Sequence, residues 1–132
     1  LVCFTDIMAT VADVLNKPLP SDCGEDSFSF LPLLTGEKDN DRPPVIHTNG
    51  GLFSIIHKNW KYINGKGPGG FSNRIMGKYP EILPRDEYEG QLYNLAEDIG
   101  ERSILYVKNP EKVKELSDLL DVYITKPTRA AK

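Results

Sequence analysis

A regular pattern of apolar positions marks residues 110–124, near the C-terminus. Apolar side chains recur there every three or four positions, the period of an amphipathic helix with one buried face. Asn109 and Pro110 suit its start, because Asn is a strong N-cap and Pro at the first helical position forfeits no hydrogen bond. Pro127 is expected to end it. The apolar stripe consists of Val113, Leu116, Leu119, Leu120, Tyr123 and Ile124.

Upstream of this helix the apolar residues form the short runs that are typical of strands. Asn49-Gly50-Gly51 and Lys58-Asn59 are turn signals between such runs. Strands are predicted at residues 45–48, 52–57, 60–63 and 90–95. We therefore predict an α+β fold, in which a four-stranded antiparallel sheet packs on the long C-terminal helix.

Shorter helical segments are expected elsewhere. Thr5 suits the N-cap of a helix that runs to about Leu15 and carries an apolar face. Residues 28–34 are densely apolar and predict a short helical turn. Asp98 and Glu101 have the spacing of a capping box, so a capped helical turn is expected between the last strand and the long helix.

A charged stretch that is closed by two prolines, residues 37–44, divides the chain into two parts. We place the boundary so that residues 1–41 form the first part and residues 42–132 the second. Residues 65–70 hold four glycines and a proline and predict a loop.

Composition narrows the classes of partner. The 132 residues carry a net charge of −3, so no broad basic surface favours nucleic acid. No run of about 18 apolar residues is present, and a membrane span is therefore not expected. The apolar start at Leu1, without Met, suggests a fragment, so the lack of a targeting signal does not identify a compartment. Cys3 and Cys23 fit no metal spacing and leave both a disulfide and two free thiols open.

Three groups of residues, in this order along the chain, resemble the sulfatase family. Residues 5–10 (T-D-I-M-A-T) and 31–36 (L-P-L-L-T-G) are similar to the end of its large domain. Residues 51–55 (G-L-F-S-I), followed by 60–62 (W-K-Y), resemble its hairpin of pattern G-x-F-A-[IV]-R-x-G-x-W-K. Residues 92–101 (L-Y-N-L-A-E-D-I-G-E) resemble its signature L-Y-D-L-x-x-D-P-G-E. The resemblance extends from residue 1 to about 124.

The resemblance implies a C-terminal part of an arylsulfatase-like hydrolase of the alkaline phosphatase superfamily. Residues 1–41 would end its large α/β domain, and residues 42–132 would be its small C-terminal domain, which supplies a wall of the substrate cleft. The whole protein would act on a sulfated small molecule or carbohydrate. A periplasmic, extracellular or lysosomal-type compartment is suggested by the family.

The family's catalytic chemistry is expected to lie outside this chain. The resemblance implies that the whole protein uses a formylglycine, made from a cysteine in a C-x-[PA]-x-R context, and a calcium ion. Cys3 and Cys23 stand in other contexts. We therefore expect no catalytic residue, metal ligand or cofactor here, and an inactive fragment.

Four residues are candidates for contact with the substrate. His47, just before the first turn, could donate a hydrogen bond to a sulfated sugar. Lys61 offers a point charge to an anion, and Arg74 could pair with a sulfate or carboxylate group. His57 stands where the family usually has Arg. For each of the four, an ordinary solvent-facing role is the alternative.

Two other functions stay open at this point. A free-standing module could bind carbohydrate or protein through its sheet, and a related enzyme could act on phosphate or phosphonate esters. The apolar face of the predicted helix 5–15 must be covered by residues 28–34 or by a second copy of the chain, so a homodimer is a further expectation.

Overall fold

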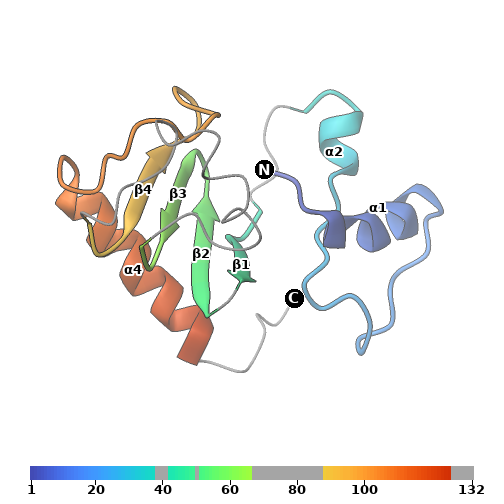
Figure 1. Cartoon of the computed structure of the whole chain (residues 1–132). Helices are drawn as coiled ribbons and strands as arrows, with labels where there is room; N and C mark the ends of the chain where they lie inside the picture. The colour runs from blue at the N-terminus through green and yellow to red at the C-terminus, as the bar shows by residue number, and fades with distance from the viewer. Residues whose placement is uncertain (38–41, 50, 67–87, 126–132) are drawn as a thin grey trace, which may run out of the picture. The chain divides into compact units, whose positions relative to one another are not determined.

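The computed structural model describes residues 1–37, 42–49, 51–66 and 88–125 (Figure 1). Its backbone contacts define two compact units, Leu1–Pro43 and Pro44–Ile124. None of the helices within these described ranges is both long and apolar enough to cross a bilayer.

The second unit contains the predicted antiparallel sheet. Its strands are β1 (Val45–Asn49), β2 (Leu52–His57), β3 (Trp60–Ile63) and β4 (Gln91–Asn94). They lie side by side in the order β1-β2-β3-β4, so each strand pairs with the next along the chain (Figure 1). This meander confirms the predicted fold class, and the strand bounds agree with the predicted ones to within one residue.

Two tight connections allow the strands to reverse direction. Gly51 has a φ of +88° beside the β1–β2 turn, a conformation that glycine adopts without steric cost. Lys58 has a φ of +55° in the β2–β3 turn, which is unusual for a residue with a side chain. The turn is short because His57 and Trp60 on either side of it are direct partners in the ladder.

The long helix α4 (Pro110–Thr125) covers one face of this sheet (Figure 1). Leu116 and Leu120 are almost fully buried and pack with the strand residues Ile55, Tyr62 and Leu92. The helix begins at Pro110 as predicted. Its buried stripe is shorter than predicted, because Tyr123 and Ile124 at the last turn are exposed. Around the buried centre pack Ile46, Phe53, Trp60, Leu105, Tyr106, Val113 and Leu119.

The first unit consists of a 3₁₀ turn η1 (Phe4–Asp6), the helix α1 (Ile7–Val14) and the short helix α2 (Leu31–Leu34). Both helices were predicted, but the role given to Thr5 as N-cap is wrong. Thr5 lies inside η1, and Asp6 instead accepts a hydrogen bond from the N–H of Cys3 at 2.8 Å. A carboxylate accepts this bond more strongly than a hydroxyl would.

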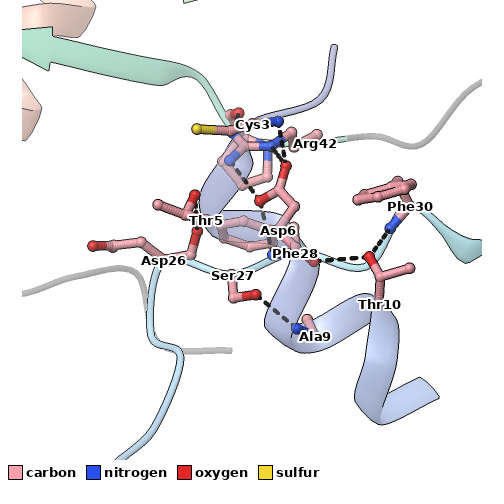
Figure 2. A network of polar contacts seen from close by, with 11 residues as sticks. Cys3, Thr5, Asp6, Ala9, Thr10, Asp26, Ser27, Phe28, Phe30 and Arg42 are labelled. Carbon is pink, nitrogen blue, oxygen red and sulfur yellow. Dashed lines mark hydrogen bonds and ion pairs between the residues drawn. The ribbon is translucent and has the colours of Figure 1, made fainter. Parts of the chain in front are cut away.

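Asp6 is the centre of the first unit (Figure 2). Its side chain is fully buried and forms a bidentate ion pair with Arg42, with Nε and Nη2 at 2.6 and 2.8 Å from the two carboxylate oxygens. The N–H groups of Cys3 and Phe28 donate to the same two oxygens. The guanidinium also lies over the Phe28 ring, 5.3 Å from its centroid. Four donors therefore satisfy one carboxylate.

The charge of Asp6 persists in spite of its burial. Burial by itself raises the pKa of a carboxyl group. Here the hydrogen bonds from Arg42 and from the N–H groups of Cys3 and Phe28 outweigh burial, and the pKa of Asp6 lies below its ordinary value of 3.8. Asp6 is therefore ionised at neutral pH and keeps the buried Arg42 paired.

Two buried hydroxyl groups extend this network (Figure 2). Thr10 donates to the carbonyl oxygen of Asp6 at 2.7 Å and accepts from the N–H of Phe30 at 3.1 Å. Ser27 accepts from the N–H of Ala9 at 2.8 Å. Polar contacts thus fix the segment 26–30 to α1.

The apolar face of α1 remains exposed. Met8, Val11 and Leu15 are each at least half exposed, and Phe4 is 87% exposed. The expectation that residues 28–34 cover this face is therefore wrong, because those residues contact α1 through Asp6 and Thr10 on another side. Dimer formation through the exposed face stays a prediction. The face borders a shallow groove lined by Phe4, Thr5, Ile7, Met8, Val11, Ala12, Lys17, Pro18 and Leu19.

Shortening Leu116 to Ala is expected to destabilise the second unit by about 2–5 kcal/mol, because it leaves a cavity between α4 and the sheet. Denaturant unfolding followed through the fluorescence of Trp60, which packs beside this core, measures the change. Val122→Ala on the exposed side of the same helix is the matched control and should change stability by less than about 0.5 kcal/mol. Equal effects of the two variants would contradict the packing of α4.

Replacing Asp6 with Asn is expected to destabilise the first unit by about 3–5 kcal/mol at neutral pH, because Arg42 would remain buried without its counter-charge. Since the folded-state pKa of Asp6 is lowered, this stabilisation is present above about pH 3.8 and is lost as the pH falls through the lower folded value. Amide hydrogen exchange at Phe28, measured by NMR, reports this loss of stability directly, because the Phe28 N–H donates to Asp6.

The exposed residue Asp13 on α1 provides the matched control for this experiment. Asp13→Asn removes the same charge from the same helix and should leave the exchange of Phe28 unchanged. If the difference in stability between wild type and Asp6→Asn, measured by the exchange of Phe28, stays constant down to pH 2, this would argue against an ionised Asp6.

Candidate functional site

The sheet has two faces with different roles. Residues paired across an antiparallel sheet share a face, and alternate residues of a strand point to opposite faces. Ile46, Ile55, Tyr62 and Leu92 are paired in one row and face α4. We call the opposite side the distal face. Two rows of paired residues cross it: Val45, Ile56, Lys61 and Tyr93, and beside them His47, Ser54, Ile63 and Gln91.

His47 is the exposed member of its row. It lies in β1, the edge strand, directly opposite Ser54 of β2. Its neighbour Thr48 is also exposed but points to the other side of the sheet. The imidazole is therefore free of the α4 core and can donate or accept a hydrogen bond on the distal face.

Lys61 lies on the same face but does not stand alone. Its Nζ is 2.7 and 2.8 Å from the two carboxylate oxygens of Glu101, and the side chains are 20% and 34% exposed. Lys61 and His47 belong to neighbouring rows and are two strands apart, which corresponds to roughly 12 Å. The structure thus places both predicted residues on one face without contact between them.

Glu101 reaches Lys61 through a turn that begins where β4 ends. The carboxylate of Asp98 accepts the N–H groups of Arg102 and Ser103 at 2.7 and 2.8 Å. Glu101 itself has a φ of +53°. The predicted capping box and helical turn are therefore wrong: Asp98 binds N–H groups four and five residues ahead, and the Glu101 side chain turns to Lys61 and away from Asp98.

Tyr93 and Gln91 form the buried polar part of the distal face. The hydroxyl of Tyr93 donates to the side-chain oxygen of Gln91 at 2.8 Å, and the amide nitrogen of Gln91 donates to the carbonyl oxygen of Gly65 at 3.0 Å. Burial, followed by the negative charges of Glu101 and Asp98, raises the pKa of Tyr93 well above its ordinary value. Tyr93 therefore stays a neutral donor at physiological pH.

The chain is closely packed where it leaves β3. A methyl group added to Gly65 would approach a side-chain carbon of Leu52 to 2.3 Å, so only glycine fits there without movement. Lys66 pairs with Glu89 at 2.8 Å, and Gln91 holds Gly65 from β4. Residues that follow β3 and residues that precede β4 are thus held together.

The other two predicted contacts are placed differently. His57 is half-buried at the end of β2 and is paired with Trp60, so alternation directs it to the α4 side, away from His47 and Lys61. Arg74 lies outside the described residues. Both therefore stay predictions.

The described residues contain no group of three His, Cys, Asp or Glu side chains that could hold a metal ion. The most buried carboxylate, Asp6, already accepts four hydrogen bonds. Cys3 and Cys23 are free thiols of the first unit. The groups that the distal face offers are hydrogen-bonding and charged side chains, among them His47, Lys61 and Glu101.

Sequence reasoning missed Glu101, Tyr93 and Gln91 as parts of this face. Glu101 lies 40 residues beyond Lys61, and local spacing favoured a capping role for it. The alternation of Gln91, Leu92 and Tyr93 was a usable signal, because it puts the first and third on the side opposite the buried leucine.

The chain was compared in sequence and in fold with known proteins. No family model matches the chain. The N-acetylgalactosamine-6-O-sulfatase of Bacteroides thetaiotaomicron is 30% identical to it over 117 residues, which is 88% of this chain and 22% of that protein.

Solved structures give the same picture. A sulfatase structure from work on the metabolism of multiple glycosaminoglycans by Bacteroides thetaiotaomicron is 29% identical, with a TM-score of 0.66 over 92% of this chain and 24% of that one. A 2-O GAG sulfatase shares the fold at 23% identity, with a TM-score of 0.58 over 91% and 24%. The chain spans less than a quarter of the length of these relatives. Over nearly its whole length it is similar to sulfatases in sequence and in fold, which confirms the resemblance that its motifs indicate.

Proposed function

We propose that this chain is the C-terminal part of a sulfatase, an enzyme that hydrolyses sulfate esters, and that it supplies a wall of the substrate cleft. The observation that carries the proposal is the match over 88% of this chain to only 22% of an N-acetylgalactosamine-6-O-sulfatase. A sulfated carbohydrate is accordingly the substrate class that we propose for the whole protein.

In this proposal the distal face is the part of the chain that meets the substrate. His47 is exposed there, and Lys61 and Glu101 offer a donor and an acceptor side by side. Hydrogen-bond donors and acceptors on a rigid sheet suit the recognition of a sugar ring, whose hydroxyl groups both donate and accept. Arg74 is a further substrate-binding candidate. His57, on the α4 side of the sheet, would contact the substrate only away from the distal face.

The bond-breaking groups lie elsewhere in the enzyme in this proposal. A formylglycine and a calcium ion would supply them, but the residues described here do not fit either group. The two cysteines precede Phe4 and Gly24 in contexts other than C-x-[PA]-x-R, and the described side chains form no acidic cluster for a hard cation. No step of the hydrolysis is therefore assigned to these residues.

A turnover assay tests the proposal. The isolated chain is expected to release no sulfate from 4-nitrophenyl sulfate or from 6-O-sulfated N-acetylgalactosamine above the buffer rate. A longer polypeptide, in which the remaining part of a sulfatase is joined to the N-terminal end of this chain, is expected to release sulfate from 6-O-sulfated N-acetylgalactosamine. Turnover by the isolated chain, or phosphate-ester but no sulfate-ester hydrolysis by the longer protein, would contradict the proposal.

The contribution of His47 can be measured in the longer protein. His47→Ala is expected to raise KM for the sulfated sugar about five- to tenfold with little change in kcat, the loss expected for one binding hydrogen bond. Thr48→Ala, which alters the neighbouring exposed residue on the other side of β1, is the matched control. If Thr48→Ala raises KM and His47→Ala does not, the substrate binds on the α4 side of the sheet, and the proposal is contradicted.

A further inference from the structure

Lys61 and Glu101 form a long-range ion pair, as Asp6–Arg42 and Lys66–Glu89 also do in the described part of the chain. The pairs Lys112–Glu115 and Lys114–Asp118 join residues three and four apart on one helix. The Lys61–Glu101 pair joins a strand to a turn 40 residues later, and the ammonium group contacts both carboxylate oxygens. Both side chains are partly buried, so water weakens this pair less than a fully exposed one.

The backbone is shaped to bring Glu101 into this pair. A side-chain-bearing residue rarely has a φ near +53°, and such residues persist where the surrounding structure holds them. Here Asp98 fixes the turn by binding the N–H groups of Arg102 and Ser103 on the C-terminal side of Glu101. Glu101 thus approaches Lys61 from a turn that is held by hydrogen bonds.

The pair changes what Lys61 can bind. A free lysine ammonium on a sheet attracts any anion, sulfate included. With a carboxylate at 2.7–2.8 Å, the pair is neutral overall, and its outer edge presents both a remaining N–H donor and carboxylate lone pairs. Tyr93, the direct strand partner of Lys61, is buried and donates to Gln91, so it adds no second cation or free donor.

We propose that Glu101 determines the ligand selectivity of the distal face: by pairing with Lys61 it makes this position a receptor for uncharged sugar hydroxyls and prevents it from binding a sulfate group. A hydroxyl can donate to the carboxylate and accept from the ammonium at once. A sulfate oxygen can only accept, and the carboxylate repels it. The identity of the ligand as a sugar rests on the proposed function, whereas the effect of Glu101 on anion binding does not.

Titration of the chain itself with sodium sulfate at constant low ionic strength tests the selectivity. NMR shifts of the Lys61 side chain and backbone report binding. Glu101→Gln, which keeps the shape and removes the charge, is expected to bind sulfate about tenfold more tightly than wild type. The gain should disappear in the double variant with Lys61→Met. Equal sulfate affinity in wild type and Glu101→Gln would overturn the proposal.

Two further variants separate pairing from other effects. Asp118→Asn frees Lys114 from the exposed helical pair and is expected to give no comparable gain, because that lysine stands alone in water. The exchanged pair, with Lys61→Glu and Glu101→Lys together, restores a neutral pair and should bind sulfate as weakly as wild type. If the exchanged pair binds sulfate as tightly as Glu101→Gln, neutral pairing is not the cause. If Glu101→Gln unfolds the turn, an exchanged pair that binds sulfate more tightly than wild type overturns the proposal.

Titration with uncharged N-acetylgalactosamine tests the ligand class. Wild type is expected to show saturable shifts at Lys61 and Glu101, and Glu101→Gln is expected to bind this sugar several-fold more weakly. Shifts that are absent in wild type would overturn the sugar assignment. Because these titrations use the isolated chain, they are independent of whether the longer protein hydrolyses sulfate esters.

Discussion

The packing of Leu116 and Leu120 against Ile55, Tyr62 and Leu92 decides which residues of every strand face away from α4. A strand residue has only two directions available, so burial of one row under α4 sends its neighbours to the distal face. A shift of one residue in the register of β3 would bury Lys61 under the helix and expose Tyr62. The position of the proposed binding groups is therefore set by the apolar residues that pack under α4.

The first unit rests on a different kind of interaction. Its buried centre is an ion pair between Asp6 and Arg42 in which all carboxylate oxygens are used. Such a pair is costly to bury, so its net contribution to stability is small, whereas the loss of one partner leaves an uncompensated buried charge. Because Arg42 comes just before Pro43 and Pro44, it fixes the chain at the point where the first unit ends.

Local patterns were sufficient to predict the sheet, the two turns and the start of α4. These features depend on alternation, on glycine and asparagine at turns, and on a proline at a helix start, all of which are visible within a few residues. His47 was likewise found from its place on β1. The resemblance to sulfatases rested on three short motifs, and the comparisons support it.

What sequence could not reveal depends on residues that are distant in the chain. Arg42 meets Asp6 across 36 positions and Glu101 meets Lys61 across 40, and neither pairing follows from spacing. The capping box expected at Asp98 failed because Glu101 had a stronger partner, a lysine ammonium, than the N–H of Asp98. Residues 28–34 were one of two predicted covers for the apolar face of α1, but the segment 26–30 has polar partners on α1 instead. Covering by a second copy of the chain stays a prediction.

The simple strand order has a consequence for how the second unit forms. β1, β2 and β3 follow one another within residues 45–63 and can zip together as successive hairpins, an event of microseconds in small peptides. β4 and α4 come later in the chain and close a much longer loop, which slows their arrival. During synthesis the three-stranded meander would thus wait, with Ile55 and Tyr62 uncovered, until the later residues of α4 supply Leu116 and Leu120.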